Sequence, residues 1–106
     1  MGINAFTKLG NTVTFTAATT APTAVQAESS TLGGNQYRII NNGSVTVFLG
    51  YGASAAEAAN NAANVATSVP LLPSTDEILS FQPNAYFTGK TASSTAVCYV
   101  TPGDGL

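Results

Sequence analysis

The stretch QYRIINNGSVTVFLG, residues 36–50, contains the clearest fold signal in this chain. Its two halves, residues 36–41 and 44–50, are rich in β-branched and aromatic side chains, which favour strands. Asn41-Asn42-Gly43 lies between them, and Asn-Gly supplies the positive φ angles that tight hairpin turns require. The sequence therefore predicts a β-hairpin here. Because both of its faces carry apolar groups, we expect it to be central and covered on two sides.

Further strands are predicted on either side of this hairpin. In TVTFTA, residues 12–17, apolar side chains alternate with threonines, which is the period of a half-buried strand. Three more strands are predicted downstream, at residues 77–81 (EILSF), 85–88 (AYFT) and 95–101 (TAVCYVT). We expect the tail Pro102–Leu106 to end the sheet.

One helix is predicted, over residues 54–64, SAAEAANNAAN. Ser54 followed by Glu57 forms a capping box, and alanine favours helix intrinsically. The alanine side chains are small, so this helix can bury little area and is interpreted as a short packed lid or spacer. The proline-flanked stretch VPLLP, residues 69–73, is predicted to be an extended link.

These segments predict one all-β domain that spans residues 1–106. Six to eight short strands, separated by Gly, Pro and Asn, are typical of a jelly-roll-like sandwich or a small barrel, here with one short helical insertion. Residues 1–34 are interpreted as an extended N-terminal arm together with the first strands. Gly33-Gly34 marks a turn at the end of this part.

The composition is unusual in its scarcity of charge. Charged residues make up 8% of the chain, against about 25% in typical globular domains. Three basic residues cannot form a nucleic-acid footprint or a polybasic membrane patch, and no apolar run reaches the length of a spanning helix. Neutral hydroxyl and amide groups are less costly to dehydrate than ions, so the composition indicates a surface that packs against protein partners. A secreted β domain with a neutral surface of no special meaning is the alternative.

The residues needed for common catalytic chemistry are scarce. The chain has no histidine, which removes Ser-His-Asp and Cys-His catalysis and the commonest zinc and iron ligand sets. Asp76 and Glu77 are the only adjacent acids, and neighbours on a strand point to opposite faces. Asp104 is one carboxylate among flexible glycines, which makes a poor calcium site. We therefore predict a non-enzymatic protein with no catalytic, cofactor-binding or metal-binding residues.

The cysteine and the tyrosines are the remaining candidates for special roles. Cys98 is the only cysteine, so it forms no intrachain disulfide, and its apolar neighbours place it in the core. Tyr37 and Tyr99 are predicted to be core residues as well. Tyr51 and Tyr86 lie next to turns and are interface candidates, because tyrosine offers contact area and one hydroxyl at low entropic cost.

Three long stretches carry a resemblance to a known group of proteins. They are RIINNGSVTVFLGYGASAAEA (38–58), VPLLPSTDEILSFQPNAYFTG (69–89) and STAVCYVTPGDGL (94–106). In these stretches, about the last 70 residues, the chain resembles small virion proteins of tailed bacteriophages. The resemblance implies a capsid decoration or cement protein, a compact β fold that forms trimers over the gaps between capsomers. It defines no binding motif, so it assigns no site residues.

Two functional hypotheses follow. The first is a virion decoration protein, assembled in the host cytoplasm, that forms a homo-oligomer (a trimer) and contacts the major capsid protein without nucleic acid, membrane or cofactor. The second is a tail or fibre component that recognises a host receptor or glycan. The second hypothesis requires exposed aromatic side chains in loops, and Tyr51, Tyr86 and Phe87 are the candidates.

Overall fold

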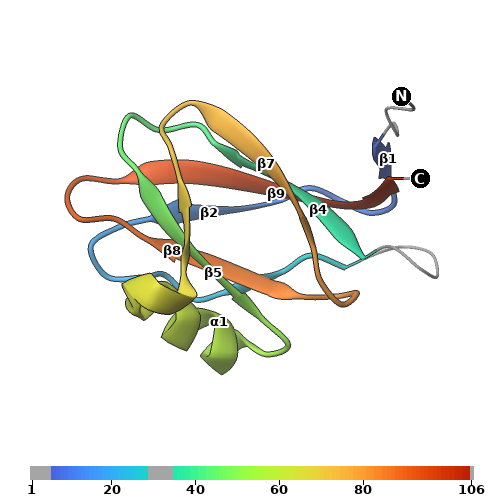
Figure 1. The fold of residues 1–106 in the computed structure, drawn as a ribbon, viewed down its shortest axis with the longest axis horizontal. Coiled ribbons are helices and arrows are strands. Elements are labelled where there is room, and N and C mark those ends of the chain that lie inside the picture. The colour runs from blue at the N-terminus through green and yellow to red at the C-terminus, as the bar shows by residue number, and fades with distance from the viewer. Residues whose placement is uncertain (1–5, 29–34, 106) are drawn as a thin grey trace.

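The computed structural model describes residues 6–28 and 35–105 of the chain, which form a mostly β sandwich (Figure 1). Two antiparallel sheets, of five and four strands, face each other, and one short helix lies outside the smaller sheet. The predicted sandwich is confirmed, whereas the barrel alternative is not, because the two sheets do not close into one. The strands are β1 (Phe6–Lys8), β2 (Val13–Ala17), β3 (Val25–Gln26), β4 (Gln36–Asn41), β5 (Val47–Gly52), β6 (Val69–Leu71), β7 (Thr75–Ser80), β8 (Tyr86–Lys90) and β9 (Ala96–Gly105).

The five-stranded sheet is organised around the long strand β9. One edge of β9 pairs with β4 along its length, and β7 pairs with the far edge of β4. The other edge of β9 pairs with β2 and then with β1. Residues 102–105 therefore continue β9, where the sequence predicted the end of the sheet. Residues 103–105 pair with β1 at one end of the sandwich (Figure 1).

The first third of the chain contributes strands to both sheets. β1 and β2 belong to the larger sheet and β3 is an edge strand of the smaller one. Any arm that reaches a neighbouring subunit would therefore have to come from residues other than 6–28. The predicted turn at Gly33-Gly34 lies outside the described residues.

The predicted hairpin over residues 36–50 is wrong, although both of its strands exist. β4 lies between β9 and β7 in the larger sheet, whereas β5 lies between β8 and β6 in the smaller sheet. The chain therefore crosses from one layer to the other between Asn41 and Val47. Each strand is central, as expected, but in its own sheet.

The buried side chain of Asn41 explains this crossing. Its Nδ2 donates to the carbonyl oxygens of Val45 (2.9 Å), Leu71 (3.0 Å) and Leu72 (3.2 Å), and its Oδ1 accepts from the Gly43 N–H (3.0 Å). These bonds connect the end of β4 to the connecting loop and to the end of β6. An amide that forms such local bonds stabilises a loop conformation other than a tight hairpin turn. Gly43 fits the same loop because a Cβ there would lie 2.3 Å from the Cβ of Ala96.

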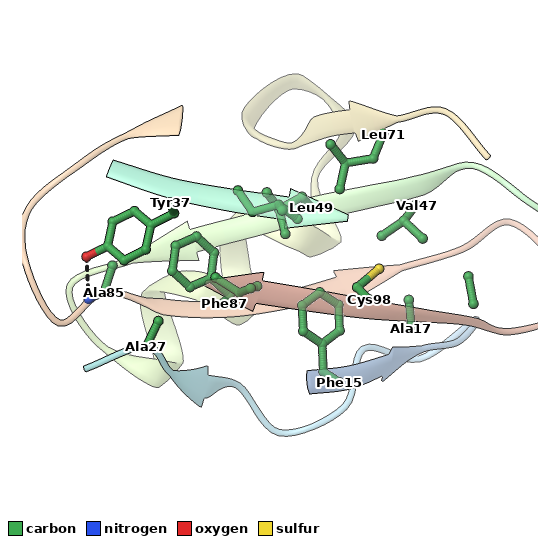
Figure 2. Packing of buried hydrophobic residues seen from close by; sticks show 13 residues of the cluster. Phe15, Ala17, Ala27, Tyr37, Val47, Leu49, Leu71, Ala85, Phe87 and Cys98 are labelled. Carbon is green, nitrogen blue, oxygen red and sulfur yellow. Dashed lines mark hydrogen bonds between the residues drawn. The ribbon is translucent and has the colours of Figure 1, made fainter. Parts of the chain in front are cut away.

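The core lies between the two sheets (Figure 2). Its largest fully buried side chains include one tyrosine, one phenylalanine and several aliphatic residues: Tyr37, Phe87, Ile39, Leu49, Leu71, Val47 and Val100. Tyr37 is a core residue as predicted, and its hydroxyl donates to the Gln82 carbonyl and accepts from the Ala85 N–H at 3.2 Å. Burial raises the pKa of this hydroxyl above its ordinary value.

Cys98 and Tyr99 are neighbours on β9 but lie in different environments. Cys98 is fully buried, as predicted, and burial raises the pKa of its thiol to about 11. Tyr99 is 37% exposed, so the prediction that it belongs to the core is wrong. The reason is strand alternation: Ala96, Cys98 and Val100 point inward, so Tyr99 points outward.

The predicted helix is confirmed as α1 (Ala55–Ala63), followed by the 3-10 turn η1 (Val65–Thr67). The Ser54 Oγ accepts from the Glu57 N–H (3.2 Å), and the Glu57 carboxylate accepts from the Ala53 N–H (3.3 Å). The first bond is that of the predicted capping box, whereas the Glu57 carboxylate reaches the residue before the N-cap instead of Ser54 itself. The helix packs on β5 and β8 and covers the outer side of the smaller sheet (Figure 1).

Candidate functional site

The larger sheet presents a broad outer surface on the side of the sandwich away from α1 (Figure 1). Strand alternation and register place on it the outward side chains of β2, β9, β4 and β7. We call this surface the neutral face, and it consists of Thr12, Thr14, Thr16, Gln36, Arg38, Ile40, Asp76, Ile78, Ser80, Val97, Tyr99 and Thr101.

The register places Tyr99 in the middle of this surface. Its cross-strand neighbours are Thr14 on β2 and Ile40 on β4. Val97 lies two residues before it on the same strand and is 36% exposed, and Ile78 on β7 is 52% exposed. The centre of the neutral face is therefore an aromatic ring beside β-branched side chains, in contact with solvent.

The charges on the neutral face cancel. The Arg38 Nε donates to the Asp76 Oδ2 at 3.1 Å, and both side chains are about half exposed. Exposed ion pairs of this kind contribute little to stability, typically about 0–1 kcal/mol. They leave these residues with no net charge at neutral pH, and Lys8 of β1, opposite Gly103 in the register, adds one positive charge at the end of the same sheet.

Several hydroxyl groups on the neutral face already have partners within the protein. The Thr14 Oγ1 donates to the Cys98 carbonyl at 2.9 Å, and the hydroxyls of Thr12 and Thr101 lie 2.8 Å apart in a hydrogen bond. A polar group that keeps such a bond loses less free energy when water is removed. Removing water from these hydroxyl groups therefore costs less free energy than it would if they had no partner within the protein.

The structure separates the three predicted interface residues. Phe87 is fully buried in the core (Figure 2), so it cannot form part of a contact surface of the folded chain, and that part of the prediction is corrected. Tyr51 is half-buried on the core side of β5, with its ring 5.0 Å from that of Phe81 and 6.1 Å from that of Phe87. Tyr86 is half-buried and lies beside Phe87 on β8, so it points to the other side of the sheet. Interface roles for Tyr51 and Tyr86 stay predictions.

Sequence reasoning missed the neutral face, although one signal for it was available. In residues 95–101 the small apolar residues Ala96 and Cys98 share their phase with Val100, and Val97 and Tyr99 have the opposite phase. The prediction that both Cys98 and Tyr99 lie in the core treats both faces of this strand as buried. The structure shows that β9 has one buried face and one exposed face.

Among residues 6–28 and 35–105, no three cysteine, aspartate or glutamate side chains gather where they could hold a metal ion. No helix in that part of the chain has the length and apolar character needed to cross a bilayer. No family model, curated protein or solved structure matches this sequence.

Proposed function

We propose that this chain is a structural protein of a bacteriophage virion, of the capsid decoration or cement type. It stabilises the shell through contacts between protein subunits and acts without catalysis or a cofactor. The observation that carries the proposal is the neutral face, a wide sheet surface with an exposed aromatic centre and no net charge. The resemblance of residues 38–106 to phage virion proteins supplies the biological setting.

The physical argument concerns the free energy of dehydration. Antiparallel sheets often have one solvated face, and soluble monomers usually place charged side chains on it. Here threonine hydroxyls and apolar groups occupy these positions, and the single ion pair is already formed. Covering such a face releases water from apolar surface and leaves no member of the ion pair buried without its partner. Interface centres have the same character, with little charge and with aromatic anchors.

The partners that fit this proposal are the major capsid protein and further copies of the chain, in a trimer on the shell. A tail or fibre role is the second hypothesis. It relied on an exposed aromatic group that included Phe87, and Phe87 has no exposed surface. The decoration role therefore has the better support.

The test uses particles of the phage that encodes this protein, prepared without it. Purified wild-type chain is added back, and bound copies per particle and the temperature of shell rupture are measured. We expect binding in numbers comparable with the major capsid protein and a higher rupture temperature. Tyr99→Lys places a charge in the centre of the neutral face and should abolish binding, whereas Ala56→Lys on the exposed side of α1 should bind as the wild type does.

Three results would contradict the proposal. Particles without the protein that are equally heat-resistant but no longer adsorb to cells would favour the tail or fibre role. Wild-type chain that stays monomeric and binds no shell would exclude both roles. Binding of Tyr99→Lys at the wild-type level would show that the neutral face is not the contact surface.

A further inference from the structure

A hollow of about 290 Å³ lies on the other side of the sandwich, where α1 meets the smaller sheet. Phe48 of β5 and Ala62 and Ala63 of α1 line it, with Val65 of η1 and Lys90 at the end of β8. It lies near the lower end of the volumes typical of ligand pockets. Its lining is apolar except for the Lys90 ammonium and the Thr91 hydroxyl, and the latter already donates to the Ser94 carbonyl at 2.7 Å.

The hollow is built on fixed elements. Lys90 pairs with Phe48 across the sheet, and the next residue, Thr91, donates its N–H to the Ala18 carbonyl at 2.9 Å. On the helix side, the Asn64 Oδ1 accepts from the Ala66 N–H at 3.1 Å. These contacts hold both walls in place without an occupant, which lowers the entropic cost of binding.

Two features of the hollow bear on what could occupy it. Val65 is 68% exposed at its edge, the highest value among the large apolar side chains of the described residues. Lys90 has no carboxylate partner within that part of the chain, where Arg38 and Asp76 form the single ion pair. No residue that lines the hollow is acidic. The hollow therefore combines uncovered apolar surface with an unpaired positive charge.

We infer that this hollow is an anchor pocket for an aliphatic side chain of a neighbouring protein subunit, held where a carboxylate of that subunit pairs with Lys90. The apolar walls take the side chain, and the ammonium group selects an acid beside it. Side chains that fill well-packed pockets contribute most to interfaces, and a charge at the rim adds mainly specificity. The inference rests on the proposed function in one respect: that function is the reason for taking the occupant to be a protein subunit. It concerns the side of the molecule opposite the neutral face.

The first test measures the chemistry of the pocket with small probes on the full chain. N-acetyl-leucine presents an aliphatic side chain and a carboxylate, N-acetyl-leucinamide lacks the charge, and acetate lacks the aliphatic part. In an NMR titration we expect N-acetyl-leucine to shift the backbone amides of Phe48, Ala63 and Thr91. The amide and acetate should bind at least about tenfold more weakly, the factor that corresponds to one modest charge or apolar contact.

Variants of the pocket then distinguish the contribution of the Lys90 charge to binding from that of the shape of the hollow. Lys90→Met should weaken N-acetyl-leucine binding about tenfold, Lys90→Arg should retain it, and Ala63→Phe should abolish it by filling the hollow from an exposed position. Lys8→Met removes the same charge from β1 and is the matched control, with unchanged binding expected. Equal binding of N-acetyl-leucine and its amide, or no shift at these amides, would overturn the inference.

The second test asks what occupies the pocket in the particle, by adding back Ala63→Phe to shells that lack the protein. Weaker attachment than the wild type would support a subunit as the occupant. Wild-type attachment of Ala63→Phe, together with probe binding, would assign the pocket to a free small acid and overturn the inference. The neutral-face proposal would be unaffected, because Tyr99→Lys tests it separately.

Discussion

The two outer surfaces of the sandwich differ in how they are covered. On the smaller sheet, α1 lies so close to β5 that a Cβ at Gly50 would be 2.2 Å from the Ala58 carbonyl oxygen and from the Ala62 nitrogen. On the larger sheet, the corresponding outward positions hold Tyr99 and Ile40, and the ring of Tyr99 is exposed to solvent. The same chain thus covers one sheet itself and leaves the other open.

This difference follows from side-chain size. Glycine on β5 and alanine on α1 allow the helix backbone to approach the sheet directly, so a short helix is enough to cover it. The larger side chains of the neutral face would keep a helix backbone from approaching this sheet so closely. They are large enough to pack into hollows on the surface of a partner. We conclude that small residues mark the surface covered within the chain, and we propose that the larger neutral residues of the open face contact another chain.

The largest expected effect comes from disrupting the covered side. Gly50→Val forces a branched side chain into the space of Ala58 and Ala62, so the helix must move away or the strand must shift. We expect the free energy of unfolding to fall by more than about 3 kcal/mol, at the upper end of overpacking effects. Urea unfolding followed by circular dichroism measures it. Thr16→Val, on the neutral face, is the control and should change stability little, and equal stability of the two variants would contradict the comparison.

The second effect concerns the joint between the two layers. Asn41→Leu removes the amide that bonds to three carbonyl oxygens and the acceptor for the Gly43 N–H. Buried groups left without partners cost about 1–3 kcal/mol each, and partial solvation of the loop limits the sum, so we expect a loss of about 3 kcal/mol. Asn42→Leu changes the exposed neighbour and should have a small effect. A small effect of Asn41→Leu would show that the crossing does not depend on this side chain.

The role of Asn41 also explains how far the sequence could predict the fold. Strands β4 and β5 were visible because β-branched and aromatic residues favour extended backbone. Their pairing was not, because the Asn42-Gly43 turn signal is local, whereas the neighbouring Asn41 side chain stabilises a different loop through its bonds to Val45, Leu71 and Leu72. Here the bonds of Asn41 reach Leu71 and Leu72, about thirty residues away, and such long-range contacts leave no local pattern.

The candidate surface was predictable in character but not in position. The scarcity of charge indicated a contact surface, and the whole chain shares that property. The prediction that Phe87 belongs to a contact surface is wrong because a position near a turn does not show which side of β8 the side chain faces. Tyr99 was assigned to the core because an apolar strand with Val97 and Val100 looks buried on both sides. Phe87 faces the core between the sheets, whereas Tyr99 faces outward on the sheet that α1 does not cover.

The third effect tests whether the larger sheet excludes water from the core beneath the neutral face. Burial raises the pKa of the Cys98 thiol to about 11, above its ordinary value near 9. The unfolded chain therefore loses this proton first, and stability that is complete below pH 9 is lost as the pH rises towards 11. We expect Cys98 to contribute a decrease of roughly 2 to 3 kcal/mol over this range.

Cys98→Ala lacks this titration and provides the reference, since tyrosines and lysines also titrate at high pH. The measurement is the free energy of unfolding of both proteins from pH 8 to pH 11. Parallel curves would show that the thiol is not protected, and that the larger sheet does not exclude water from the core.

The smallest expected effect on stability comes from Tyr99, whose ring is the largest on the neutral face. Tyr99→Thr keeps a good strand former and removes the exposed ring, so the free energy of unfolding should change by less than about 1 kcal/mol. Shell attachment, in contrast, should be lost, because the ring is the anchor at the centre of the surface. A loss of about 3 kcal/mol or more would show that Tyr99 is part of the folded core, and the two faces would then not differ as described. Unchanged stability together with unchanged attachment would contradict the anchor role of the ring, because a single exposed aromatic side chain is common on protein surfaces and needs no contact to explain it.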